Sequence, residues 1–191
     1  MNYVGLLRGI NVGGNSTVSM ARLKQVFEHV GMTSVATYIN SGNVFFSSTL
    51  LHEAEIAMLL ERAIETQFGF AVKVLVRSSE RLLATAQALP KSWVNNPTMK
   101  CDVIFLWPEI DTFDILEKVS INREVDSVKY VSGALLWSVK RADRTKSRMQ
   151  KLIGTDLYKQ MTIRNCNTVR VLADRVEQLG VADSPGRPPR R

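Results

Sequence analysis

The sequence predicts an α+β protein with two subdomains, each of the order βαββαβ with an antiparallel sheet, followed by C-terminal helices. Three observations predict this fold. In the first 77 residues, short apolar runs alternate with longer segments whose apolar residues recur at helical spacing. From residue 78 onward the same order returns in a looser form. Both halves also place a tyrosine shortly before a Ser-Gly turn between their middle strands, which indicates an internal duplication.

The strands of the first half are short apolar runs bounded by turn residues. The run YVGLL predicts a buried strand, and the turn Asn40-Ser41-Gly42 separates the two strands of a hairpin. The last strand has Lys73 on its outer side. The four predicted strands cover residues 3–7, 35–39, 43–46 and 72–76.

Two helices are predicted between these strands. Ser19 precedes the first helix, which has one apolar face and is ended by Gly31. The second helix covers residues 52–68, and Gly69 ends it. This order of strands and helices is that of the ferredoxin-like unit, in which two helices pack on one face of an antiparallel sheet.

The second half predicts the same order with shorter helices. Ser79 is the expected N-cap of a helix that runs to residue 89, and a connector over residues 90–97 follows it. Asn167 or Thr168 is expected to cap the final helix, which ends at Gly180. Between them we expect strands at residues 101–107, 124–130 and 134–139 and short helices at residues 113–119 and 156–161.

These elements divide the chain into three parts. The first ferredoxin-like subdomain covers residues 1–77, and a second, looser one with the C-terminal helices covers residues 78–183. The segment 184–191, SPGRPPRR, has no apolar side chain to bury, and we expect a disordered basic tail there.

The net charge of +7 lies almost wholly in the second half of the chain. Residues 1–90 carry seven basic and six acidic residues, whereas residues 91–191 carry 18 and 12. Such a bias favours anionic partners, either a small molecule or nucleic acid, and it also serves solubility alone. The apolar content of 45% and the charged content of 23% are ordinary for a globular protein with a core.

Cysteine and histidine usage indicates a cytoplasmic protein without a metal site. Cys101 and Cys166 do not make a disulfide framework, and a reducing compartment fits them. The N-terminus does not resemble a signal peptide, and no apolar run is long enough to span a membrane. The histidines, His29 and His52, have no partner ligands at metal spacing, so we expect no metal and no cofactor.

The opening loop, Arg8-Gly9-Ile10-Asn11-Val12-Gly13-Gly14-Asn15, is the first candidate site. Its glycines permit close backbone approach, Arg8 offers a planar fork for phosphate or carboxylate, and a helix N-terminus follows. Neither the Walker A pattern nor the GxGxxG pattern is present. The alternative is a tight strand-to-helix connection in which Arg8 makes a structural ion pair.

Three further polar clusters are candidates. Arg164 and Asn165 stand at the start of the last helix, where they cap it or join Arg8 and Asn11 in one cleft between the subdomains. Ser41 and Asn43 surround the first hairpin turn, for which turn chemistry is the simpler explanation.

A basic run over residues 140–151 contains six basic residues and one acid. Such a run is typical either of a surface that binds the phosphate backbone of nucleic acid or of a solvent-exposed surface without a ligand. Lys146 is the residue of this run that we include in the predicted ligand-binding set.

Three motifs together resemble a bacterial family that is known only as a domain of unknown function. They are LLRGINVGG at residues 6–14, TYINSGNVFF at residues 37–46 and TIRNCNTV at residues 162–169. The resemblance covers the chain to about residue 179, and it implies two ferredoxin-like subdomains and no known activity, cofactor or substrate. Cys166 stands where this family usually has tryptophan in its T-x-R-N-W-N-T signature, so no base stacking by that ring is expected here.

The predicted function is binding of a phosphorylated or other anionic ligand, a nucleotide or nucleic acid, between the subdomains. An enzyme that acts on a small anionic substrate is one alternative, although no catalytic residue or general base is identified. A structural or interaction protein without a ligand is the other. Neither the substrate nor the oligomeric state follows from the residues.

Overall fold

The computed structural model describes residues 1–12 and 17–182. These residues form two compact units. Unit 1 is Met1–Leu83 together with the segment from Val171 onward, and unit 2 is Ala84–Arg170. The sequence prediction instead keeps residues 78–183 together in the second subdomain. The predicted tail, residues 184–191, lies outside the described residues.

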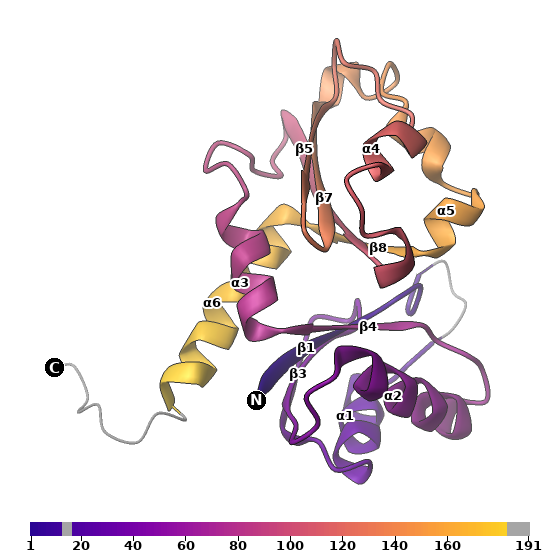
Figure 1. The fold of residues 1–191 in the computed structure, drawn as a ribbon, viewed down its shortest axis with the longest axis vertical. Coiled ribbons are helices and arrows are strands. Elements are labelled where there is room, and N and C mark those ends of the chain that lie inside the picture. Colours follow the sequence, from indigo (N-terminus) through magenta and orange to yellow (C-terminus); the bar gives the residue numbers. More distant parts are fainter. Residues whose placement is uncertain (13–16, 183–191) are drawn as a thin grey trace, which may run out of the picture. The chain divides into compact units, whose positions relative to one another are not determined.

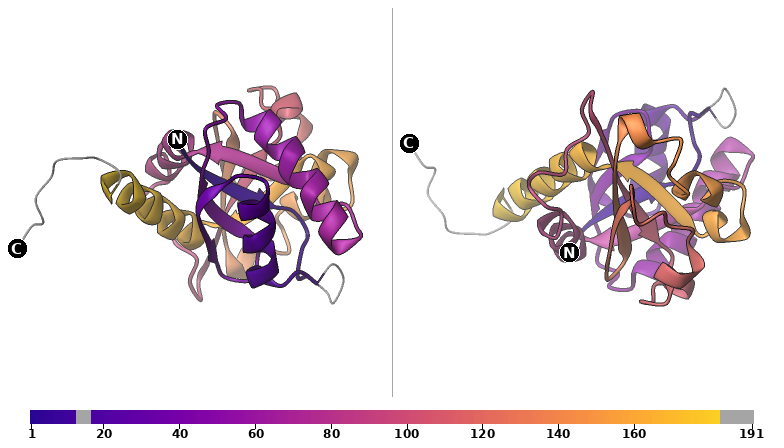
Figure 2. Two further views of the ribbon diagram at one scale, coloured as in Figure 1. Left: turned by 90° about the horizontal axis from the view of Figure 1, so that it is seen from below. Right: turned by 90° about the horizontal axis from the view of Figure 1, so that it is seen from above.

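Unit 1 contains a four-stranded antiparallel sheet with two long helices. The sheet order is β2-β3-β1-β4, which is the order of a ferredoxin-like unit. The left view of Figure 2 shows α1 and α2 side by side over this sheet. The elements are β1 (Asn2–Leu7), α1 (Met20–His29), β2 (Thr33–Tyr38), β3 (Asn43–Ser47), α2 (Glu53–Phe68) and β4 (Val74–Ser78).

Unit 2 contains a second four-stranded antiparallel sheet, with shorter helices (Figure 1). Its order, β6-β7-β5-β8, repeats the order in unit 1. The strands are β5 (Met99–Leu106), β6 (Ser127–Val131), β7 (Ala134–Lys140) and β8 (Met161–Asn165). The α-helices are α4 (Ile115–Lys118) and α5 (Asp156–Lys159), and 3-10 turns cover Pro108–Ile110, Arg141–Asp143 and Met149–Leu152.

The two sheets also match in their turn contacts. The Leu7 N–H donates to the Gly42 carbonyl at 2.8 Å, and the Leu106 N–H donates to the Gly133 carbonyl at 2.9 Å. In each unit, therefore, the glycine of the Ser-Gly turn closes onto the end of a central strand. This shared contact supports the internal duplication that the sequence predicts.

The predicted α+β fold class is confirmed, with two four-stranded antiparallel sheets and C-terminal helices. Two helices, α3 (Ser79–Gln87) and α6 (Cys166–Ala182), pass from one unit to the other along the chain. Each begins directly after the edge strand β4 or β8 of its sheet.

The predicted helix ends are correct where a cap or a left-handed glycine decides them. The Ser19 hydroxyl caps α1 by accepting from the Arg22 N–H, at 3.5 Å. Gly31 and Gly69 follow α1 and α2 with φ of +90° and +79°, which is the backbone that glycine adopts without a steric cost.

Several predicted boundaries are wrong, and four of them can be traced to particular contacts or residues. The Ser78 hydroxyl, not that of Ser79, accepts the Arg81 N–H at the start of α3, at 3.3 Å. The final helix begins at Cys166, so Asn167 and Thr168 lie inside it. It also continues through Gly180 to Ala182. Strand β4 begins at Val74 rather than residue 72, because Val74 is the first residue paired with β1, opposite Leu7.

Each unit has an apolar core on one face of its sheet. In unit 1 the aromatic centre of the core is Phe46, which packs on Tyr3 and Phe27 with ring centroids 5.7 and 5.4 Å away. In unit 2 the corresponding face of the sheet presents Trp137 and Ile104. None of the helices in the described part of the chain has the length and apolar character needed to cross a bilayer.

Candidate functional site

Asn11, in the described part of the opening loop, binds two other segments of the backbone through its side chain. Its Nδ2 donates to the Val18 carbonyl at 3.0 Å and to the Asn40 carbonyl at 2.8 Å, and its Oδ1 accepts the Val18 N–H at 2.8 Å. Asn11 has a φ of +54°, a conformation that asparagine tolerates better than most residues. The amide is therefore used to join the loop to the β2–β3 turn.

Other members of the predicted loop site are described in part or not at all. The Arg8 N–H donates to the Lys73 carbonyl at 2.9 Å, which extends the pairing of β1 with β4 by one residue. Gly13, Gly14 and Asn15 lie outside the described residues. A ligand role for the loop thus stays a prediction.

The β2–β3 turn is held together by Asn43. Its buried side chain donates to the Tyr38 carbonyl at 3.1 Å and to the Ser41 hydroxyl at 3.0 Å. Ile39 in this turn has a φ of +49°, which is unusual for a β-branched residue, and its side chain is about half exposed. These contacts explain Ser41 and Asn43 as turn chemistry.

Arg164 and Asn165 have different surroundings in unit 2. The Arg164 side chain is buried, and Nη1 donates to the Thr162 hydroxyl and the Ile163 carbonyl, both at 2.9 Å. Burial lowers the pKa of Arg164 to about 10, since water no longer stabilises its charge. The Asn165 Oδ1 accepts the Asn167 N–H at 2.8 Å, which caps α6.

Unit 1 contains a counterpart of Arg164 that sequence reasoning missed. Arg77 on β4 lies opposite Val4 in the sheet, as Arg164 on β8 lies opposite Val103. Each arginine donates Nη1 to the carbonyl of the residue before it, Val76 or Ile163. A buried arginine on the edge strand, one or two residues before a helix, is therefore common to both units.

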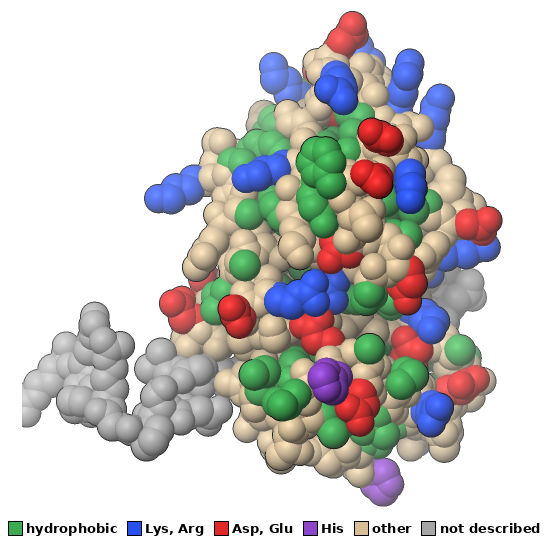
Figure 3. Space-filling view, viewed as in Figure 1, with side chains coloured by type: hydrophobic (Ala, Val, Ile, Leu, Met, Phe, Trp, Pro, Cys, Tyr) green, Lys and Arg blue, Asp and Glu red, His purple; other side chains and the backbone are tan. Residues whose placement is uncertain are grey.

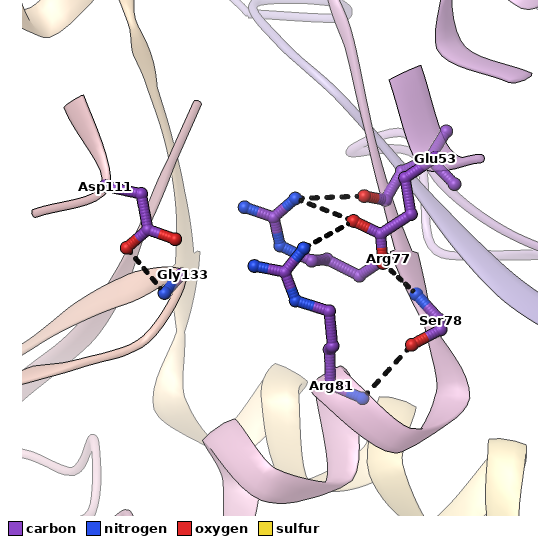
Figure 4. A network of polar contacts seen from close by, with 7 residues as sticks. Glu53, Arg77, Ser78, Arg81, Asp111 and Gly133 are labelled. Carbon is purple, nitrogen blue, oxygen red and sulfur yellow. Dashed lines mark hydrogen bonds and ion pairs between the residues drawn. The ribbon is translucent and has the colours of Figure 1, made fainter. Parts of the chain in front are cut away.

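The Glu53 carboxylate binds two arginines and a backbone N–H (Figure 4). Arg77 Nη1 lies 3.3 Å and Arg81 Nη1 lies 2.7 Å from its Oε2, while the Ser78 N–H donates to its Oε1 at 2.7 Å. In unit 2, Asp111 Oδ1 accepts the Gly133 N–H at 2.7 Å and so fixes the β6–β7 turn. Each carboxylate thus holds a backbone N–H group in place, that of Ser78 or of Gly133.

Lys146 lies on the surface of unit 2 and forms an ion pair with Asp143, three residues before it, at 2.8 Å. Hydrogen bonding to this carboxylate raises the pKa of Lys146. On the face shown in Figure 3, lysines and arginines are interspersed with acidic side chains. The basic run therefore contains at least one internally neutralised charge.

The structure brings some of the predicted site residues together. Asn11 contacts the hairpin turn through Asn40, and Asn43 contacts Ser41, all within unit 1. Lys146, Arg164 and Asn165 belong to unit 2. A common cleft with Arg8 and Asn11 stays a prediction.

A groove between α1 and α2 is the feature of unit 1 that sequence reasoning missed. Its volume is about 490 Å³, within the range of small-molecule sites. Arg22 and His29 are its charged or ionisable lining residues. Its other lining residues are the polar Gln25, Thr66 and Gln67 and the apolar Val26, Val30 and Ala63.

The spacing of Arg22 and His29 was a signal for this groove. They are seven residues apart, so they lie on the same face of α1. The sequence did not show which helix faces them. A smaller depression of about 280 Å³ along α2 differs in chemistry, because its lining includes the acids Glu61 and Glu65. Among the described residues no cluster of three or more potential metal-ligating side chains is present.

The chain is similar to a protein of known structure over most of its length. That protein is the conserved bacterial protein SP0830 from Streptococcus pneumoniae, with 26% sequence identity and a TM-score of 0.76. The match covers 91% of this chain and 97% of the other. No curated protein matches the sequence. Residues 1–137 match the family described as "Protein of unknown function (DUF1697)". The chain therefore belongs to the DUF1697 family.

Proposed function

We propose that the protein binds a small anionic molecule, a phosphate or carboxylate compound, in the groove between α1 and α2. The observation that carries this proposal is the lining of the groove, in which Arg22 and His29 are accompanied by no acidic residue. A guanidinium group binds phosphate and carboxylate with two parallel hydrogen bonds. The ligand class follows from that chemistry.

The rest of the lining suits a ligand with an apolar part. Val26, Val30 and Ala63 form the apolar portion, and Gln25 and Gln67 offer amide donors and acceptors at the sides. Val26 is buried and Ala63 half-buried, so they form a fixed floor, whereas the polar lining side chains are exposed. A mononucleotide, with an anionic group and a ring system, is a ligand of this description.

The local electrostatics of α1 favour an anion. Its first turn contains Arg22 and no acidic residue. The N-terminal end of a helix carries partial positive charge, to which the guanidinium of Arg22 adds. The +7 net charge of the chain favours the approach of anions in the same way.

Arg22→Ala tests the proposal with adenosine monophosphate as the probe. We expect the dissociation constant, measured by isothermal titration calorimetry at low salt, to rise roughly 10- to 100-fold, since a charged hydrogen bond contributes about 1.5–3 kcal/mol. Arg62→Ala is the matched control, because Arg62 is an exposed arginine on α2 that does not line this groove. It should leave affinity within about twofold.

A second variant tests the location of the binding site without changing the charge of the groove. Ala63→Leu fills the floor of the groove, and it should also weaken binding of the probe. Equal affinity of Arg22→Ala, Ala63→Leu and the unaltered protein would contradict the proposed site. Undetectable binding of adenosine monophosphate, ribose phosphate and inorganic phosphate would contradict the ligand class.

A further inference from the structure

The two cysteines of the chain meet in unit 2. In the pairing of β5 with β8, Asp102 lies opposite Asn165, so their chain neighbours Cys101 and Cys166 lie close together at the end of the paired segment. Both side chains are fully buried and both are free thiols. The Cys101 thiol hydrogen-bonds to the Cys166 sulfur.

Cys166 donates its thiol to the Trp93 carbonyl at 3.5 Å and to the Asn167 Oδ1 at 3.4 Å, and other groups around it favour the thiolate. Cys166 is the first residue of the 17-residue helix α6, and the partial positive charge of a helix N-terminus favours an anion. The hydrogen bond from Cys101 and the nearby Arg170 guanidinium outweigh burial and lower the pKa of Cys166 to about 7. The same hydrogen bond, together with burial, raises the pKa of Cys101. The two thiols therefore have unequal roles.

A buried hydroxyl group lies on the other side of Cys101. Ser138 on β7 is directly opposite Cys101, so both side chains point to the same face of the sheet. Its Oγ is buried and has no hydrogen-bond partner among the described residues. An unpartnered buried hydroxyl costs stability, so the surroundings of Cys101 are not optimised for packing alone.

A segment of chain covers the thiol pair. We call residues 90–98 the strap. The Trp93 carbonyl of the strap lies 3.5 Å from the Cys166 Sγ. Asn167 holds the strap by two bonds to Asn95, one through its Oδ1 at 3.2 Å and one through its Nδ2 at 2.9 Å. Arg170 Nη2 donates to the Pro90 carbonyl at 2.9 Å.

These bonds identify what TIRNCNTV does in unit 2. Asn165 caps α6, Cys166 lies beneath the strap and Asn167 holds the strap in place. Because the two Asn167 bonds are exposed, water can replace them and the strap can open locally. A small oxidant then has access to a thiol pair that is otherwise covered.

We propose that Cys101 and Cys166 form an oxidisable dithiol that a peroxide converts reversibly into a disulfide. The Cys166 thiolate attacks one peroxide oxygen, the O–O bond breaks, and the released hydroxide takes a proton to become water. The sulfur of Cys101 then attacks the resulting sulfenic acid, the S–O bond breaks and a second water leaves. The two thiols lose two electrons, and the peroxide accepts them.

Mass spectrometry of the native protein after treatment with hydrogen peroxide tests this. We expect the mass to fall by two hydrogen atoms, and a proteolytic digest to contain a peptide that links Cys101 to Cys166. A reducing agent should restore both thiols. A gain of one or more oxygen atoms without the cross-link would overturn the proposal, as would two thiols left unchanged.

Two variants test the role of Cys101 and the role of the strap separately. Cys101→Ser should stop at the sulfenic acid of Cys166, because no thiol remains to attack it. Asn167→Ala should speed formation of the disulfide by about tenfold, because it removes two exposed hydrogen bonds to the strap and also the amide oxygen that accepts the Cys166 thiol at 3.4 Å. Asn122→Ala is its control, since that amide donates to the Lys146 carbonyl and not to the strap. Equal rates for both asparagine variants would contradict the covering role of the strap.

Discussion

Asp126→Ala is expected to destabilise the protein by about 3–5 kcal/mol, measured as the free energy of unfolding in urea. Asp126 is 7% exposed, and it accepts hydrogen bonds from four groups in unit 2, one of them the Ser147 side chain. Its Oδ1 accepts Trp137 Nε1–H at 2.9 Å, and its Oδ2 accepts the N–H groups of Asn122 and Arg148 at 2.9 and 3.3 Å. Alanine leaves these donors without an acceptor.

We also expect the stability that Asp126 contributes to depend on pH. Burial alone raises the pKa of Asp126, but the hydrogen bonds from Ser147, Asn122, Trp137 and Arg148 outweigh it and leave the pKa lowered. A lowered folded-state pKa stabilises the protein above the unfolded pKa of about 3.9, and the contribution disappears as pH falls through the folded value. The difference in stability between the unaltered protein and Asp126→Ala should therefore be constant near neutral pH and shrink below about pH 4.

Asp156→Ala is the control for this experiment. Asp156 is an exposed residue whose contact is an ion pair with Lys159, three residues away. Its replacement should change the free energy of unfolding far less than Asp126→Ala does, because solvent screens an exposed ion pair. An Asp126→Ala protein as stable as Asp156→Ala would show that the buried carboxylate does not organise this part of unit 2.

Gly42→Ala is expected to cost about 2–4 kcal/mol of unfolding free energy, from two separate causes. Gly42 has a φ of +74°, where any side chain is unfavourable. A Cβ at this position would also lie 2.7 Å from the Leu7 Cβ and 2.8 Å from the Ile10 Cδ1. Leu7 cannot move aside, because its N–H donates to the Gly42 carbonyl and its Cβ is fixed to the central strand.

Gly69→Ala separates the two causes. Gly69 has a similar φ of +79°, but a Cβ there would meet nothing within 4 Å. It should cost about 1 kcal/mol, the backbone part alone. Urea unfolding of both variants gives the steric part as the difference between them, and equal losses would contradict the close approach of Gly42 to Leu7 and Ile10.

The start and end of α1 were predictable because residues next to them in the sequence determine where the helix begins and stops. The Ser19 side chain caps the first turn of α1, and the left-handed backbone of Gly31 follows its last turn. The start of α6 was not predictable in the same way, because Asn165 and Asn167 are equally good caps by residue type. The pairing of Asn165 on β8 with Asp102 on β5 decides between them. These two residues are more than 60 positions apart in the sequence.

The candidate site was harder to predict than the fold. The polar residues of the motifs were found, but Asn11, Asn43 and Asn165 bind backbone within their own units. The groove depends on which faces of α1 and α2 meet, and amphipathic patterns do not specify their pairing. The contact of Cys166 with Cys101 was not predictable either, because it depends on how β5 pairs with β8.

The most direct test of the proposed anion site is a titration of isotopically labelled protein with adenosine monophosphate, followed by the chemical shifts of the backbone amides. We predict that the largest changes fall on Arg22 to Val30, in and just after α1, and on α2 around Ala63 and Gln67, and that Arg22→Ala needs about 10- to 100-fold more ligand to produce them. Changes confined to residues 8–18 and the β2–β3 turn would contradict the groove and place the ligand on the opening loop instead.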